Sequence, residues 1–278
     1  AAAPFTWELA NIIAAKPVMN SLKWSPQDGT TLYVIGLSNH KVTEYNTDAF
    51  FAFHHINGYE ANNYIYMDVL ANNMTGGKVP SSGLTIHNML NMSARNKLVA
   101  TAEYRRYKIP MPSSFDSDIV KEVNFTFQRL IDQDGKLYAT VELPRINDLK
   151  ATKKNCYWYG WAPHAGGSSK FADTAIIKVN VCSNSNDKNA VGTDKNNVMA
   201  WFVEKHFPSE PIFVPKPNST LEDDGVVLAT VFDGEEGATY LVIIDATSMK
   251  TVATIYCEDD WKHLMSFGIH GDFFSCKN

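Results

Sequence analysis

FAFHHINGYE, at residues 51–60, places a histidine pair on an aromatic segment that we expect to form a strand. Neighbouring residues of a strand point to opposite faces, so only one of His54 and His55 can face a shared interior. A further histidine, His270, lies in FGIHGDFF at residues 267–274. Each histidine alone is more simply an ordinary core or surface residue. Together, two imidazoles far apart in sequence can meet at one metal ion, although two are too few to hold a redox metal alone.

Length and composition favour a globular protein built from β structure. The chain has 278 residues, 45% of them hydrophobic and 12% aromatic, with a net charge of −5. This length suffices for one large core or two ordinary cores. Acidic and basic residues are interspersed without a basic stripe, so we expect no nucleic-acid partner. No apolar run approaches the roughly 20 residues that a transmembrane helix needs.

Short β-type segments separated by turn signals run along most of the chain. The segments that we expect to form strands are 31–37, 49–56, 64–70, 121–130, 136–143, 157–161, 174–181, 198–204, 225–232, 240–245 and 251–256. The Asp-Gly turn at 132–135 predicts a tight hairpin. A helical period occurs at 84–97, and the polar stretch 184–197 predicts a surface loop. The pattern indicates an all-β sandwich, barrel or propeller, and no WD or kelch repeat selects among these three.

Cysteines and glycosylation sequons leave the compartment open. The four cysteines fit either two disulfides or four buried thiols, and their spacing matches no zinc motif: Cys156, Cys182, Cys257 and Cys276. Four asparagines begin an Asn-X-Ser/Thr triplet: Asn73, Asn91, Asn124 and Asn218. The protein is therefore either secreted or cytoplasmic, and the sequons favour secretion slightly.

Two glutamates at the ends of apolar segments are candidate partners of the histidines. Glu142 ends a largely apolar strand, and Glu210 lies between two prolines ahead of another. A buried carboxylate is costly unless it is paired. One interpretation is therefore a structural ion pair, for example with Arg145. The other is a carboxylate that accepts the second ring N–H of a metal-bound imidazole.

Two further clusters have both an ordinary and a functional interpretation. The acidic turn Glu222-Asp223-Asp224 offers oxygen ligands for a hard cation such as Ca²⁺, but its spacing matches no calcium loop. We favour a turn with solvated acids for Asp223 and Asp224. The aromatic run at 157–161 can line an apolar tunnel, or at least half of it can fill a β core.

Five segments, taken in order, carry a family resemblance: residues 51–60, 142–147, 209–215, 222–228 and 270–271. They resemble the carotenoid cleavage oxygenase family, particularly its animal branch of β-carotene oxygenases and the retinal-pigment-epithelium retinoid isomerase. The resemblance implies an all-β fold that is part of a seven-bladed β-propeller, with 1–278 as the C-terminal part of a single propeller domain. It also implies Fe(II) on the propeller axis, held by four histidines.

Carried over by motif, His54 and His270 resemble the third and fourth iron ligands. Glu142 and Glu210 resemble the carboxylates that orient iron-bound imidazoles. Nitrogen ligands with open coordination positions suit non-haem iron that binds dioxygen. The family's first two iron histidines lie upstream of any matching segment here. The resemblance therefore implies that an N-terminal propeller chain, from the same precursor, completes the fold and the site.

Two main functions follow from this resemblance. The first is oxidative cleavage of a polyene double bond in a carotenoid or apocarotenoid by Fe(II) and O₂, which requires the partner chain's histidines. The second is a non-catalytic carotenoprotein that binds and stores or displays a carotenoid pigment. A retinoid isomerohydrolase is a third option within the same family.

Overall fold

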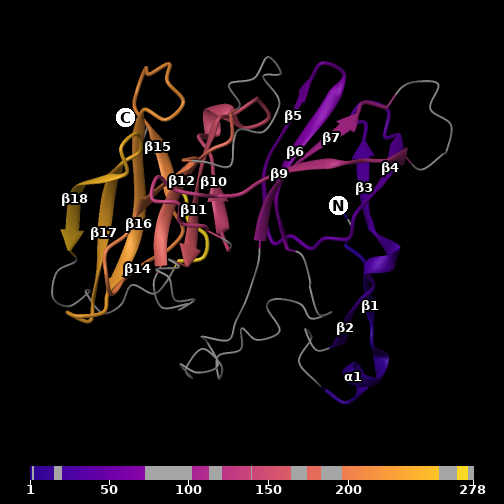
Figure 1. The fold of residues 1–278 in the computed structure, drawn as a ribbon, viewed down its shortest axis with the longest axis horizontal. Helices are drawn as coiled ribbons and strands as arrows, with labels where there is room; N and C mark the ends of the chain where they lie inside the picture. Colours follow the sequence, from indigo (N-terminus) through magenta and orange to yellow (C-terminus); the bar gives the residue numbers. More distant parts are fainter. Residues whose placement is uncertain are drawn as a thin grey trace.

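The computed structural model describes residues 1, 3–15, 21–72, 102–112, 121–138, 140–163, 174–182, 196–256 and 268–274. Within these ranges the strands form five sheets, and Figure 1 shows the larger ones side by side, from β3–β4 at one end to β16–β18 at the other. Every pairing between named strands is antiparallel except that of β4 with β8. The expected all-β architecture is therefore confirmed.

The first two sheets consist of β1 (Phe5–Trp7) and β2 (Leu22–Trp24), and of β3 (Thr30–Ile35), β4 (Val42–Thr47) and β8 (Lys121–Glu122). The third consists of β5 (His55–Ala61), β6 (Tyr64–Asn72), β7 (Ala102–Pro110) and β9 (Phe125–Gln128), and the fourth of β10 (Glu142–Arg145), β11 (Tyr157–Pro163), β12 (Thr174–Asn180) and β13 (Val198–Trp201). The fifth consists of β14 (His206–Pro208), β15 (Ile212–Pro215), β16 (Gly225–Asp233), β17 (Ala238–Asp245) and β18 (Lys250–Tyr256). The described helices are α1 (Leu9–Ile13) and two 3₁₀ turns, Pro26–Asp28 and Asp148–Lys150. None of them is long and apolar enough to cross a membrane.

The hairpin of β16 and β17 shows how sequence sets strand register. Val227, Ala229 and Val231 alternate with more exposed residues and are buried, as expected for a strand with one face on a core. Asp233 ends the strand, and its side chain accepts the backbone N–H groups of the two glutamates in the turn. Gly237 completes the turn with a φ of 63°. A register slip would move the buried valines to the outer face, so the turn and the burial pattern support the same pairing.

Three apolar clusters fill the spaces between successive sheets, as in stacked propeller blades. Side chains that pack between neighbouring sheets include Leu32, Tyr45, Val69 and Tyr107; Leu70, Tyr104, Trp158 and Ile177; and Tyr159, Ile176, Val227 and Val242. Trp158 and Tyr159 are consecutive on β11 and enter different clusters. Both faces of the β10–β13 sheet are therefore covered by other sheets.

Most predicted strands are present with shifted ends, but three were wrong in part. The strand predicted over 121–130 is divided into β8, which pairs with β4, and β9, which pairs with β7 in another sheet. The strand predicted over 49–56 begins only at His55. Before it, Phe51 makes an isolated bridge with Asn72, and the backbone of Phe50 is bonded to the Thr30 hydroxyl. Among the described residues of 136–141, only Leu137 has a bridge partner, Ile131, and β10 starts at Glu142. The Asp-Gly turn that precedes it is confirmed by a φ of 79° at its glycine. The predicted helix at 84–97 and most of the loop at 184–197 lie outside the described residues.

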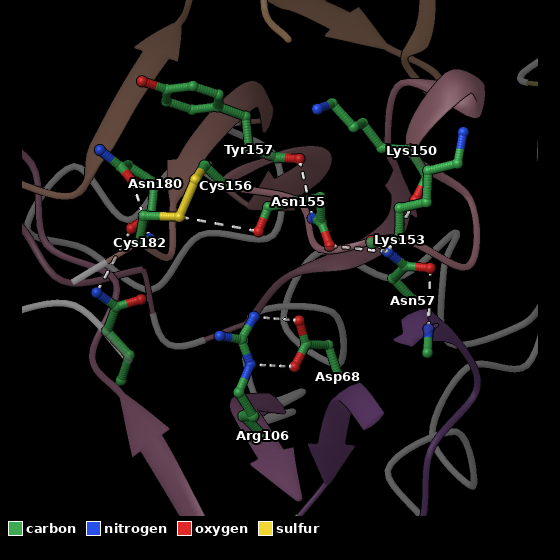
Figure 2. Close-up of polar contacts among 12 residues, drawn as sticks. Asn57, Asp68, Arg106, Lys150, Lys153, Asn155, Cys156, Tyr157, Asn180 and Cys182 are labelled. Atoms are coloured by element: carbon green, nitrogen blue, oxygen red, sulfur yellow. Dashed lines mark hydrogen bonds and ion pairs between the residues drawn. A yellow bond between two sulfur atoms is a disulfide. The ribbon is translucent and has the colours of Figure 1, made fainter. Parts of the chain in front are cut away.

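Two of the four cysteines form a disulfide, which was one of the two alternatives that the sequence left open. Cys156 and Cys182 form a disulfide with their Cα atoms 4.9 Å apart, next to the first residue of β11 and just after the end of β12 (Figure 2). Cys257 and Cys276 lie outside the described residues. Of the sequon asparagines, Asn124 and Asn218 are exposed, and the other two are also outside the described ranges.

A polar seam joins the β5–β9 sheet to the loop that follows β10. The side-chain amide of Asn57 donates to the carbonyls of Lys150 and Lys153, at 3.3 and 2.8 Å, and to the side-chain oxygen of Asn155 at 2.8 Å (Figure 2). Its own oxygen accepts two backbone N–H groups, at 2.9 and 3.2 Å. The seam therefore fixes strand β5 relative to the segment between β10 and β11.

A buried ion pair lies in the β5–β9 sheet. Asp68 on β6 accepts two hydrogen bonds from Arg106 on β7, at 2.7 and 2.6 Å, and the two side chains are only 1% and 2% exposed (Figure 2). Burial alone would lower the pKa of the guanidinium, but the hydrogen bond and charge of Asp68 raise it. Arg106 is therefore a permanent buried cation whose charge is matched by the Asp68 carboxylate.

Candidate metal centre

His54 stands immediately before β5, an edge strand of its sheet, and faces β10. Its carbonyl accepts the backbone N–H of Leu70, which fixes the start of the strand pairing. Its ring Nδ1 lies 2.8 Å from Oε2 of Glu142, the first residue of β10. The other oxygen of Glu142 is buried and has no hydrogen-bond partner among the described residues. The Glu142 carboxylate is thus directed at His54 alone.

His270 has a matching carboxylate in Glu210, which lies between β14 and β15. Nδ1 of His270 is 3.2 Å from Oε1 of Glu210. Oε2 of Glu210 accepts the backbone N–H of Gly271 at 2.8 Å, and the glutamate side chain is only 5% exposed. Arg145 donates to both oxygens of Glu210, at 3.2 and 3.3 Å. Glu210 is therefore ion-paired, as one interpretation predicted, and it also contacts the His270 imidazole.

The two imidazoles face each other through their Nε2 atoms, which are 3.5 Å apart. A carboxylate only accepts hydrogen bonds, so each glutamate selects the tautomer that has its proton on Nδ1. In that tautomer each Nε2 presents a bare lone pair, and the two lone pairs point toward one another. Such an arrangement is relieved by a cation between the nitrogens, either a proton or a metal ion.

The pair of nitrogens fits a metal ion in both spacing and donor type. Imidazole nitrogens bind zinc, a well-characterised metal, at about 2.0–2.1 Å, so two nitrogens on one ion lie at most about 4.2 Å apart. The observed 3.5 Å satisfies that limit. Within the described residues, however, no cluster of three or more His, Cys, Asp or Glu side chains has metal-binding geometry. His54 and His270 are thus two candidate ligands, and His55, which is exposed, does not belong to the pair.

An apolar cavity of about 270 Å³ adjoins His270. Its wall includes Ile212 of β15, Leu228 of β16 and Leu241 of β17, together with Phe273. Its polar lining residues include Ser209, Glu210 and Thr230. An apolar space that opens beside a candidate metal ligand suits a hydrophobic ligand.

The acidic turn is a link between two sheets and not a group of solvated acids. The Glu222 carboxylate accepts the backbone N–H groups of Cys156 and Tyr157, both at 2.7 Å, and burial raises its pKa despite those bonds. Asp223 lies 2.6 Å from the Lys178 ammonium. The prediction of solvated acids was therefore wrong for Asp223, because Lys178 on β12 projects toward the turn.

Half of the aromatic run belongs to the core, as one interpretation predicted. Trp158 and Tyr159 are buried, whereas Tyr157 and Trp161 are partly exposed. The Tyr159 hydroxyl donates to the carbonyl of Ala246, and burial raises its pKa far above the usual value. Tyr159 is therefore a neutral structural residue.

Comparison with known proteins decides the family. A family model described as retinal pigment epithelial membrane protein, RPE65, matches residues 2–275. The chain belongs to the RPE65/carotenoid cleavage oxygenase family. The family predicted from the five motif segments is thereby confirmed.

Sequence relatives of this family member include animal and plant enzymes. The mouse (Mus musculus) beta,beta-carotene 15,15'-dioxygenase is 26% identical over 298 residues, which cover 97% of this chain and 47% of the mouse protein. The Arabidopsis thaliana chloroplastic carotenoid cleavage dioxygenase 8 is 25% identical over 277 residues, covering 96% of this chain and 43% of the plant protein. The chain thus spans about half the length of the relatives that it matches.

Solved structures support the same fold. An ACO/RPE65 chimera superposes with a TM-score of 0.69 at 20% identity, covering 98% of this chain and 50% of the chimera. A mutant of Synechocystis apocarotenoid oxygenase gives a TM-score of 0.67 at 20% identity, covering 96% of this chain and 48% of that enzyme. The five open sheets of this family member therefore represent part of a β-propeller, as the resemblance implied.

Sequence reasoning named both histidines and both glutamates, and the structure brings all four together. It named Arg145 only as a possible ion-pair partner, and it did not identify the backbone N–H of Gly271. A proline inside the β10 segment was an available signal, because proline in a strand often marks an irregularity that redirects side chains.

Proposed function

We propose that this chain forms part of an oxygenase that cleaves a double bond of a carotenoid or apocarotenoid with O₂ at an Fe(II) centre. The observation that carries the proposal is the pair of facing Nε2 atoms, each on an imidazole held through Nδ1 by its own glutamate. Both relatives described above are named as dioxygenases, and this favours an enzyme over a pigment-storing carotenoprotein.

In this proposal His54 and His270 hold the iron, which supplies the dioxygen chemistry when bound. Glu142 and Glu210 retain the Nδ1 protons, so both imidazoles stay neutral and aimed, as second hydrogen bonds do in other metal sites. The apolar cavity beside His270 contributes a water-poor surface for a polyene. Positioning one double bond against a fixed centre lowers the entropic part of the barrier.

Two further imidazoles are required, because four histidines hold iron in the family that the sequence resembles. We propose that they lie on an N-terminal propeller half from the same precursor, which would also cover the open edges of the sheets described here. Denaturing electrophoresis of the active protein tests this arrangement. A second chain, or one longer chain, is expected; an active preparation that contains only these 278 residues would contradict it.

Metal analysis and product analysis test the function. The complete propeller, purified without chelator, should hold about one iron per site, and the variants His54→Ala and His270→Ala should lose it. His206→Ala is the matched control, because His206 bonds the Tyr240 hydroxyl in a different part of the structure. Incubation with a carotenoid in air should release aldehydes. Absence of iron from the wild-type protein would refute the proposed chemistry.

A carotenoprotein gives the opposite result in the same experiment. An intact bound polyene, visible in the absorption spectrum and unchanged after incubation in air, would indicate storage or display of the pigment. Iron bound without cleavage would separate metal binding from catalysis.

A further inference from the structure

We propose that Arg145 is a positioning residue that aligns His270 through Glu210, and that a β-bulge in β10 exists to bring it there. The proposal rests on the function proposed above and adds a residue to it. Among the described residues, Arg145 makes its side-chain hydrogen bonds to Glu210 and Gly271 and not to either imidazole. Its action passes through the Glu210 carboxylate and the Gly271 backbone.

The bulge changes the direction of one side chain. Glu142 and Arg145 are three residues apart, so in a regular strand they would point to opposite faces. Their partners on β11 are Trp161 and Tyr159, only two residues apart, so β10 contains one extra residue. Leu143, at this point, has a φ of 54°, which is uncommon for a residue other than glycine. A bulge of this kind re-aims side chains and recurs beside active sites.

As a result, one short strand serves both imidazoles. Glu142, at the start of β10, contacts His54 directly. Arg145, at its end, contacts Glu210, which contacts His270. The relative placement of the two Nε2 atoms therefore depends on the geometry of β10.

Arg145 also holds the backbone beside His270. One guanidinium nitrogen, Nη2, donates to Oε2 of Glu210 and to the carbonyl of Gly271. The N–H of Gly271 donates to the same glutamate. The carbonyl of Gly271 is thus bound by Arg145 and its N–H by Glu210, and these two side chains also bind each other. A guanidinium suits this role because its planar fork donates in several directions at once, whereas a lysine ammonium acts as a point charge.

His270 needs this network more than His54 does. The side chain of His270 is 62% exposed, against 27% for His54. Residues 268–274 form no strand or helix, whereas His54 leads directly into β5. Packing therefore contributes little to the orientation of His270. Glu210, buried at 5% exposure, needs a cation to remain in place as an acceptor.

Metal affinity of the complete propeller tests the proposal. The metal-free protein is titrated anaerobically with Fe²⁺, and with Co²⁺ for its absorption spectrum. Arg145→Gln should weaken binding about 10- to 100-fold, as the loss of other supporting partners of metal ligands does. Arg145→Lys should give an intermediate loss because it keeps the charge. The control Lys178→Gln removes a largely buried ion pair that joins the same two sheets through Asp223 instead of Glu210, and it should change affinity less than twofold.

The outcomes separate this proposal from the proposed function. Arg145→Gln with wild-type affinity and an unchanged Co²⁺ spectrum would overturn the role of Arg145 while leaving the iron site intact. A wild-type protein that binds neither metal would refute the function. In that case crystal structures of the metal-free proteins decide the role of Arg145: His270 should turn away from His54 in Arg145→Gln and stay in place in Lys178→Gln. An unmoved His270 would overturn the proposal.

Discussion

Replacing Arg106 by methionine should destabilise the protein by about 3–5 kcal/mol, the range found when one partner of a buried ion pair is removed. The geometry places this pair at the costly end of such contacts. Two hydrogen bonds of 2.7 and 2.6 Å join side chains that are 1% and 2% exposed. Methionine leaves Asp68 buried without its counter-charge.

A double replacement distinguishes the cost of a lone charge from the worth of the pair. Asp68→Leu combined with Arg106→Met should recover most of the loss, because apolar residues of similar volume often replace buried ion pairs at little cost. Urea unfolding followed by fluorescence measures all variants. Lys205→Met is the control, since the Lys205–Glu235 pair is exposed and its loss should leave the unfolding midpoint unchanged. A loss below about 1 kcal/mol in Arg106→Met would refute the reasoning.

Three further predictions concern the neighbouring sheets. Because burial raises the pKa of Glu222 above 4.5, the protonated side chain stabilises the fold below about pH 4.5, and this stabilisation is lost as the pH rises through the folded-state pKa. Glu222→Gln should remove this part of the pH dependence, as measured by urea unfolding between about pH 4 and 7. Replacing both Cys156 and Cys182 by serine should lower the free energy of unfolding by about 3.5 kcal/mol, the loop entropy expected for a separation of 26 residues. Unfolding of the double variant and of the unsubstituted protein is compared under non-reducing conditions, and equal stabilities would contradict a stabilising disulfide. Gly225→Ala should cost about 1–3 kcal/mol by thermal unfolding, because its Cβ would collide with the carbonyl of Val214, and a neutral result would mean that β15 moves freely.

Much of the fold was accessible from local chemistry. The Asp-Gly turn at 134–135 requires a positive φ at its glycine, and it was placed correctly. The segment 225–232 was also correctly assigned to a strand, which the structure shows as β16. The start of β5 was misjudged, because Phe50 obtains its hydrogen bonds from the Thr30 side chain, a contact between residues far apart in sequence.

The residues of the site could be predicted from the sequence, but the hydrogen bonds that connect them could not. Motifs pointed to Glu142 and Glu210, yet nothing in the order of residues states that Arg145 shares a face with Glu142. That relation depends on the extra residue in β10 and on the unusual backbone of Leu143. The cysteine pairing likewise depends on which strands are neighbours: β11 and β12 bring Cys156 and Cys182 within bonding distance.

The amide of Asn57 makes its position chemically exclusive. One end of the side chain donates to three oxygens and the other end accepts two N–H groups. Aspartate has the same shape but would set its oxygens against those of Lys150, Lys153 and Asn155. Leucine has the volume but offers neither function. Only a short amide can both donate to the oxygens and accept from the N–H groups at this junction. The distance between β5 and the loop after β10 therefore depends on a single functional group.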